Sequence, residues 1–126
     1  MWVEFNPNPA GRRAGDCVVR AVAKALDVSW ETAYAMLAAN GYAMGDLPNA
    51  DYVWGATLRQ HGFYRKALPS DCPDCYTVEE FSEEHPNGTY VLGCGNHVVT
   101  VVDGNAYDSW DSTQCVPQYV WYREGE

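Results

Sequence analysis

The sequence has few basic side chains and no long hydrophobic run. Lysine and arginine number 8 against 17 aspartate and glutamate residues, which gives a formal net charge of −9 at pH 7. Nucleic-acid binders contact phosphates through Lys and Arg, so the absence of any basic stretch argues against this class. No run reaches the roughly 18 apolar residues of a membrane-spanning helix. The N-terminus also lacks the charged-then-apolar pattern of a signal peptide.

We therefore expect a soluble, cytoplasmic protein that binds neither nucleic acid nor a membrane. The acidic balance favours a neutral or basic partner over an acidic one. The length of 126 residues predicts one domain, 1–126, with one core. A folded chain of this size buries roughly two-thirds of the surface that its unfolded form exposes, so it needs no covalent or metal cross-link for stability.

Cysteine is odd in number. The five are Cys17, Cys72, Cys75, Cys94 and Cys115. At least one thiol is therefore free within the chain, and in a reducing compartment all five can be free.

Cys72 and Cys75 form a CxxC motif, which is half of a zinc site, but no second CxxC or HxxxH follows. The remaining ligands would have to come by folding from Cys94, Cys115, His61 or His85. We therefore expect no metal and no cofactor, and we interpret the motif as a local disulfide or two free thiols. A zinc-stabilised structural domain is the rival hypothesis.

Helical patterns fill the first half of the chain. Asp16 is placed as an N-cap, with Cys17 in the first turn of an amphipathic helix of about three turns. Arg20 lies off the apolar stripe of that helix. Ser29 caps a second helix, which the pair Asn40-Gly41 is expected to end. A third helix is predicted from about residue 50 to residue 60.

Strand patterns fill the second half. Strands are expected at 63–67, 89–92, 97–102, 106–110 and 118–122. The capping box Thr77-x-x-Glu80 opens a short helix before Pro86. The β-branched run Val98–Val102 predicts a central strand that is buried on both faces, and Asp103-Gly104 predicts a hairpin turn after it. The fold class is α+β, with helices first and an antiparallel sheet last.

Cys17 stands where a reactive thiol is favoured. A free thiol titrates near 8.5, so most of it is protonated and unreactive at neutral pH, whereas helix N-terminal amides and a nearby imidazolium stabilise the thiolate. Arg20, one turn further on, adds a cation, while the carboxylate of Asp16 acts in the opposite direction.

Of the three histidines, His97 is the candidate partner of this thiol. His61 and His85 each lie at the end of a predicted helix, where a structural role is expected. His97 follows the glycine-containing stretch 93–96, which leaves room for a substrate to approach. A sheet-edge histidine that is hydrogen-bonded to a loop is the alternative interpretation.

The predicted hairpin offers His97 a carboxylate. A two-residue turn at Asp103-Gly104 places Asp108 on the face of His97, at a diagonal of about 7–8 Å between backbones. A three-residue turn would instead place Asp111 opposite His97. The common two-residue hairpin favours Asp108, and ordinary solvated turn residues are the alternative for both.

These residues carry a resemblance. The stretch Gly15-Asp16-Cys17-Val18-Val19-Arg20-Ala21 is similar to the nucleophile motif of papain-like cysteine peptidases, most closely that of the ovarian-tumour (OTU) deubiquitinases. The stretch from His97 to Trp110 looks like the His-strand, hairpin and Asp-strand of the same superfamily, as in C39-like bacteriocin-processing peptidases. The whole chain also resembles small papain-like proteins that bacteriophages and prophages encode.

The resemblance implies a papain-like α+β fold, with the nucleophile on the first helix and His and Asp on a C-terminal antiparallel sheet. It implies Cys17 as nucleophile, His97 as general acid/base and Asp108 as the group that orients the imidazole. The implied activity is cleavage of a peptide or isopeptide amide bond through a thioester. A protein or peptide substrate, no cofactor and a monomeric state are expected.

The family's oxyanion hole combines the amide of the cysteine with an upstream Gln side chain, and here the sequence departs from the pattern. Gly11 occupies the usual Gln position, and Ala14 stands where the OTU pattern has Asp. Asn8 and Asn6 are the substitutes that we predict if the loop folds back. A catalytically inactive binding or inhibitor module and an acyl transferase on the same fold are the alternative functions.

Overall fold

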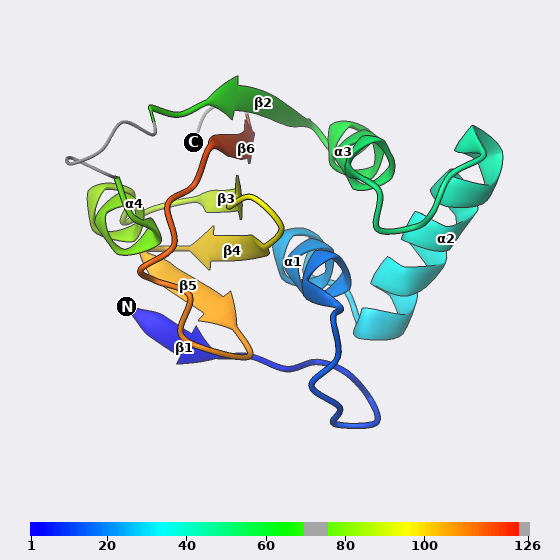
Figure 1. Ribbon diagram of the computed structural model, residues 1–126, viewed down its shortest axis with the longest axis horizontal. Coiled ribbons are helices and arrows are strands. Elements are labelled where there is room, and N and C mark those ends of the chain that lie inside the picture. The colour runs from blue at the N-terminus through cyan, green and yellow to red at the C-terminus, as the bar shows by residue number, and fades with distance from the viewer. Residues whose placement is uncertain (70–75, 124–126) are drawn as a thin grey trace.

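The computed structural model describes residues 1–69 and 76–123. Cys72 and Cys75 lie outside the described residues, so the interpretation of their CxxC motif stays a prediction. In the described part, four helices and one six-stranded, mostly antiparallel sheet form an α+β architecture (Figure 1).

The helices and strands lie close to where the sequence patterns place them. The helices are α1 (Cys17–Leu26), α2 (Trp30–Met44), α3 (Asp51–Arg59) and α4 (Val78–Glu84). The strands are β1 (Trp2–Glu4), β2 (Phe63–Ala67), β3 (Thr89–Gly93), β4 (Val98–Val102), β5 (Asn105–Asp108) and β6 (Tyr119–Arg123). Their order in the sheet is β1-β5-β4-β3-β6-β2, and β1 alone pairs in parallel, with β5.

Strand β4 is the interior strand that the β-branched run predicts. Its side chains alternate between two cores, because Val98 packs with helices α1, α2 and α3 while Val99 and Val101 pack with α4. The hydroxyl of Thr100 donates a hydrogen bond of 2.8 Å to the carbonyl of Ala21, which fixes α1 to this strand. In Figure 1, α1, α2 and α3 lie on the right of the sheet and α4 lies on the left.

The hairpin between β4 and β5 has the two-residue turn. Asp103 and Gly104 both have positive φ, 49° and 81°, which suits the right-handed twist of the flanking strands. Val102 accordingly pairs with Asn105, and the register that places Asp108 near His97 is confirmed.

One expected helix end is wrong, and one strand was not expected. Asn40-Gly41 does not end α2, which continues to Met44 and ends at Gly45 with φ 72°. Gly41 serves close packing instead, since a Cβ there would lie 2.8 Å from the carbonyl oxygen of Asp46. The sequence patterns also missed β1, whose three residues are too few for a periodic signal.

No helix in residues 1–69 and 76–123 combines the length and the apolar character that crossing a bilayer requires.

Gly93 is a packing constraint at the end of β3. A Cβ at this position would lie 2.1 Å from the ring of Tyr119, which itself stacks on Trp54. We expect Gly93→Ala to lower the free energy of unfolding by about 2–3 kcal/mol, because the ring has to leave its packed position. Urea denaturation measures this loss. Gly15→Ala is the control, since nothing lies within 4 Å of a Cβ at Gly15, and an equal loss in both variants would contradict the packing argument.

Candidate functional site

Cys17, His97 and Asp108 come together at the start of α1. Cys17 is the first residue of α1, His97 directly precedes β4, and Asp108 is the last residue of β5. The thiol of Cys17 is hydrogen-bonded to the imidazole of His97. His97 Nε2 lies 2.6 Å from Oδ2 of Asp108, so Nδ1 is the ring nitrogen that remains for the sulfur. Three residues far apart in the sequence thus form one continuous chain of contacts.

The carboxylate of Asp108 is buried and fully engaged. It is 1% exposed and accepts a hydrogen bond of 2.6 Å from the hydroxyl of Ser112 in addition to the contact with His97. The backbone amide of Ser109 donates to Oδ1 at 2.8 Å, and Arg20 Nη2 donates to the same oxygen at 3.0 Å. A carboxylate that accepts several hydrogen bonds and faces a cation stays ionised even when it is buried.

Arg20 connects this carboxylate to the start of α1. The sequence placed Arg20 off the apolar stripe, but its side chain is buried, with the residue 4% exposed. Its second guanidinium nitrogen forms an ion pair with Asp16, whose other oxygen accepts a hydrogen bond of 2.9 Å from Trp30 Nε1. Asp16 does occupy the N-cap position, but its side chain makes no capping hydrogen bond because Arg20 and Trp30 engage it.

The N-terminal segment holds the backbone of β5 in place. The carbonyl of Asp108 accepts hydrogen bonds from Trp2 Nε1 at 3.0 Å and from the amide of Phe5 at 2.8 Å. The next carbonyl, that of Ser109, accepts from Arg13 Nη1 at 2.7 Å. Strand β1 and the loop after it therefore position the residue that contacts His97.

The surroundings of Cys17 favour its thiolate. Burial raises the pKa of the thiol, but hydrogen bonds from His97 and from the amide of Val98 outweigh burial, together with the charges of His97 and Arg20, and lower the pKa below its ordinary value. Burial likewise disfavours a charged His97, yet its hydrogen bonds to Asp108 and Cys17 raise the pKa of the imidazole to about 9. Both shifts act in the same direction, toward a thiolate on Cys17 and an imidazolium on His97.

The other cysteines that the structure describes have raised pKa values. Burial, with the nearby Cys115 and Asp108, raises the pKa of Cys94 to about 12. Burial and the charge of Asp108 also raise the pKa of Cys115. Cys17 is thus the one thiol in residues 1–69 and 76–123 whose pKa is lowered.

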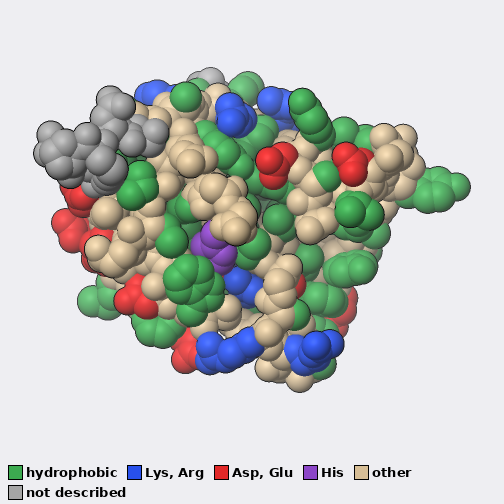
Figure 2. Space-filling model, viewed as in Figure 1, with side chains coloured by type: hydrophobic (Ala, Val, Ile, Leu, Met, Phe, Trp, Pro, Cys, Tyr) green, Lys and Arg blue, Asp and Glu red, His purple; other side chains and the backbone are tan. Residues whose placement is uncertain are grey.

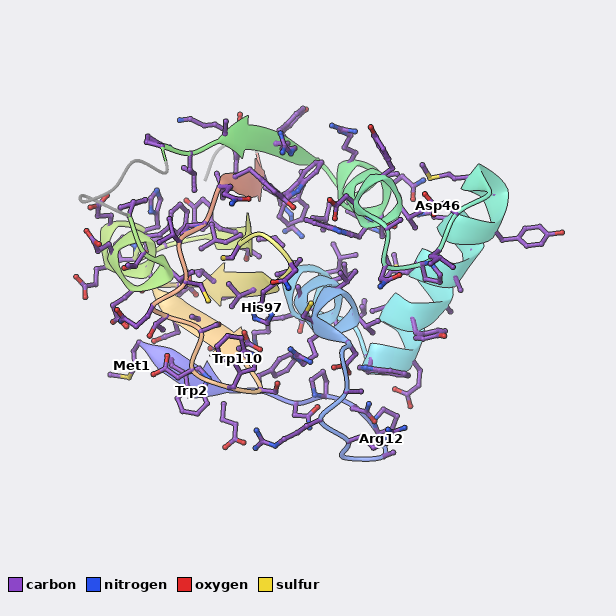
Figure 3. The ribbon with its side chains drawn as sticks, in the orientation of Figure 1. Met1, Trp2, Arg12, Asp46, His97 and Trp110 are labelled. Atoms are coloured by element: carbon purple, nitrogen blue, oxygen red, sulfur yellow. The ribbon has the colours of Figure 1, made fainter. Side chains whose placement is uncertain are left out.

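A pocket of about 600 Å³ opens over these groups. Its lining includes Cys17, His97, Arg13, Asp51 and Trp110. A histidine side chain reaches the surface on the face drawn in Figure 2, and Figure 3 shows Trp110 beside His97, with ring centroids 4.7 Å apart. Trp110 is 46% exposed, so one wall of the pocket is an accessible indole.

Asn6, Asn8 and Asp111 are not brought to this pocket. Asn6 Nδ2 donates to the carbonyl of Arg12 at 3.2 Å, and Asn8 Oδ1 accepts from the amide of Ala10 at 2.9 Å. Both amide side chains therefore stabilise their own loop, and neither lines the pocket. The carboxylate of Asp111 accepts hydrogen bonds from Thr113 instead of facing His97.

His61 and His85 each contact a carbonyl of their own helical segment. His61 Nδ1 lies 2.9 Å from the carbonyl of Thr57, and His85 Nδ1 lies 2.8 Å from that of Phe81. Within the described part of the chain, no group of three or more His, Cys, Asp or Glu side chains is arranged to hold a metal ion.

Sequence reasoning missed three contributions to the site: the buried bridge of Arg20, the hydroxyl of Ser112 and the backbone contacts of β1. Arg20 carried a signal that was available, because an arginine among small apolar residues of a helix needs a buried carboxylate as partner. Ser112 carried none, since one serine in a turn-rich stretch does not reveal its acceptor.

Comparison of the chain with models of protein families, with curated proteins and with solved structures found no match.

The ion pairs of Arg20 with Asp16 and Asp108 can be tested by measuring the free energy of unfolding. Arg20→Gln leaves Asp16 and Asp108 without their shared cation, so we expect the free energy of unfolding to fall by about 3–5 kcal/mol. Chemical denaturation measures this loss. Arg12→Gln is the matched control, because Arg12 is exposed and its replacement should cost less than about 0.5 kcal/mol. Similar losses in the two variants would contradict a structural role for the buried guanidinium.

The titration of His97 is the second test. The nearby carboxylate favours the charged imidazole, so we expect a midpoint of about 9 for its ring protons in NMR spectra. Asp108→Asn removes that charge, and the midpoint should fall by about 1–3 pH units. The His97→Gln variant identifies the signal by its loss. A midpoint near 6.5 in the wild type, unchanged in Asp108→Asn, would refute the coupling.

Proposed function

We propose that the protein is a papain-like cysteine hydrolase that cleaves a peptide or isopeptide bond through Cys17, His97 and Asp108. The observation that carries this proposal is the continuous contact from the thiol to the imidazole and on to a buried carboxylate, with 2.6 Å between His97 Nε2 and Asp108 Oδ2. A nucleophile, a base within hydrogen-bond reach and a third group that orients the base are the signature of nucleophilic catalysis.

The proposed reaction begins when the sulfur of Cys17 attacks the carbonyl carbon of the scissile amide. The imidazolium of His97 then donates its proton to the leaving amine as the carbon–nitrogen bond breaks, which leaves a thioester on Cys17. Neutral His97 next takes a proton from water, and the hydroxide adds to the thioester. The carbon–sulfur bond then breaks, which releases the carboxylic acid and regenerates the Cys17 thiolate beside the imidazolium of His97. Asp108 stabilises the charged ring and keeps its orientation throughout.

The N-terminus of α1 supports the developing oxyanion in this scheme. The side chain of Asp16 does not cap α1, because Arg20 and Trp30 engage it. The N-cap side chain therefore accepts no hydrogen bond from the first amides of the helix, those of Cys17 and Val18. Such amides are suited to a negatively charged oxygen. They take over, in our proposal, the part that the sequence analysis assigned to Asn8 and Asn6.

The substrate in this proposal is a protein or peptide that reaches the Cys17 pocket past the exposed ring of Trp110. An amine could replace water as the acceptor of the acyl group, and the product would then be a new amide. Product analysis by mass spectrometry separates hydrolysis from transfer. An inactive binding module differs from both, because its Cys17 would show no enhanced nucleophilicity.

Alkylation by iodoacetamide tests the proposed nucleophile. We expect Cys17 to react at least about tenfold faster than Cys94 or Cys115 at pH 7, since only its pKa is lowered among the described cysteines. As the pH rises, its rate should level off at a lower pH than the rates of Cys94 and Cys115. Peptide mapping by mass spectrometry assigns the alkylation to each of the five cysteines of the chain.

The His97→Gln variant is the companion measurement. Without the imidazolium, the rate for Cys17 at pH 7 should fall about tenfold or more and should rise with pH, as it does for an ordinary thiol. The rates for Cys94 and Cys115 serve as internal controls and should not change. A wild-type Cys17 that reacts no faster than those two would remove the basis of the enzyme proposal.

A further inference from the structure

A second groove begins where the Cys17 pocket ends. It has a volume of about 410 Å³ and lies between α3 and β2; we call it the α3–β2 groove. Its lining is Asp51, Tyr52, Gly55, Arg59, Arg65 and Trp121. Asp51 lines both the groove and the Cys17 pocket, so the two spaces adjoin at the first turn of α3.

Helical spacing and one glycine form the groove. Asp51, Gly55 and Arg59 are four residues apart, so they lie along one side of α3. The floor is formed by Gly55 and Trp121, because a Cβ at Gly55 would lie 3.0 Å from the indole of Trp121. On the sheet side, Arg65 of β2 pairs with Trp121 of β6. The groove therefore has an arginine on each wall.

Both arginines lie against aromatic rings, and their charges are available to a ligand. The guanidinium of Arg59 lies 5.0 Å from the ring centroid of Trp121, and that of Arg65 lies 4.2 Å from that of Tyr119. Among the interactions of the described residues, neither guanidinium takes part in an ion pair or a hydrogen bond. Figure 2 shows basic side chains gathered along β2 at the upper edge of the molecule.

Trp121 forms part of the floor of the groove and carries a buried indole N–H. Its side chain is 3% exposed, and its Nε1–H finds no hydrogen-bond acceptor among the described residues. A buried donor without an acceptor is costly, and few such groups occur in folded proteins. This N–H has almost no accessible surface, so the groove offers a ligand its two guanidinium groups, and the indole N–H beneath them can report on binding.

We propose that the α3–β2 groove binds a carboxylate side chain of the substrate, so that an acidic residue near the scissile bond favours cleavage. Guanidinium groups recognise carboxylates through paired N–H donors, and stacking on an aromatic ring holds them in place with less loss of side-chain freedom. Anion binding in the groove stands on its geometry alone. The step from anion to substrate residue rests on the proposed function.

The carboxylate of Asp51 is the one negative charge in the lining. It accepts a hydrogen bond of 3.1 Å from Trp54 Nε1 and forms no ion pair with Arg59 or Arg65. It marks the boundary with the Cys17 pocket, and Arg59 lies about two helical turns further along α3. The net charge of −9 favours neutral or basic partners overall, and the groove is a local exception with a preference of its own.

A binding experiment tests the groove without any catalysis. The probe is acetyl-Glu-Glu-Glu-amide, titrated at low ionic strength into the Cys17→Ser variant. The signal is the indole N–H resonance of Trp121 in nitrogen–proton NMR spectra, assigned by its loss in Trp121→Phe. We expect this resonance to shift and saturate with the glutamate peptide, and to stay in place with acetyl-Gln-Gln-Gln-amide.

Two double variants separate the groove from net charge. Arg59→Gln/Arg65→Gln should reduce the affinity for the glutamate peptide about tenfold or more. Arg12→Gln/Lys66→Gln removes the same charge from exposed positions outside the groove and should leave the affinity within about twofold. A Cys17→Ser protein that does not respond to the glutamate peptide, or equal losses in the two double variants made in it, would overturn the proposed site.

The link to Cys17 is tested with iodoacetyl peptides that carry Glu or Gln two, three or four residues from the reactive carbon. We expect Glu at one of these spacings to raise the alkylation rate of Cys17 about tenfold over matched Gln. Arg59→Gln/Arg65→Gln should abolish this ratio and leave the rate with iodoacetamide unchanged. Equal Glu and Gln rates at every spacing would overturn the substrate assignment. A slow reaction with iodoacetamide itself would instead count against the proposed function.

Discussion

The structure depends on the hydrogen bonds and ion pairs that stabilise one buried carboxylate, that of Asp108. Asp108 is 1% exposed, and four donors surround it: Arg20, His97, the hydroxyl of Ser112 and the amide of Ser109. These donors come from α1, from the residue before β4 and from the chain that follows β5, so every element of the site meets at this charge. A buried charge without such partners would cost several kcal/mol, which makes the arrangement of these elements mutually dependent.

The same balance explains why one thiol differs from its neighbours. Burial raises the pKa of Cys94 and Cys115, and the negative charge of Asp108 acts in the same direction. Cys17 is also partly buried, but it lies at a helix start, accepts hydrogen bonds from His97 and the Val98 amide, and faces the charge of Arg20. Asp108 thus suppresses ionisation of nearby thiols directly and promotes that of Cys17 through His97. Reactivity follows from position and not from the thiol itself.

The face of the sheet that α1, α2 and α3 cover carries both the Cys17 site and the α3–β2 groove. Tyr119 and Trp121 of β6 form much of its aromatic surface, and they fit because Gly93 and Gly55 carry no side chain. The same indole of Trp121 supports Arg59, while Tyr119 supports Arg65. Packing that stabilises the core therefore also presents cations next to the Cys17 pocket. A substitution of Tyr119 or Trp121 would therefore change both the stability of the protein and the position of the two guanidinium groups.

The sequence alone determined the features that depend on a few neighbouring residues. These are the helix that starts at Cys17, the buried strand Val98–Val102, and the two-residue turn that sets the register of Asp108. Asp108 could therefore be preferred to Asp111, since turn chemistry and strand alternation act over short distances. Tertiary structure alone decided that Arg20 reaches Asp108, 88 residues away, and that Asn6 and Asn8 stabilise their own loop. It also decided that β1 joins the sheet, because three residues carry no periodicity of their own and pair only where a neighbouring strand offers free backbone groups.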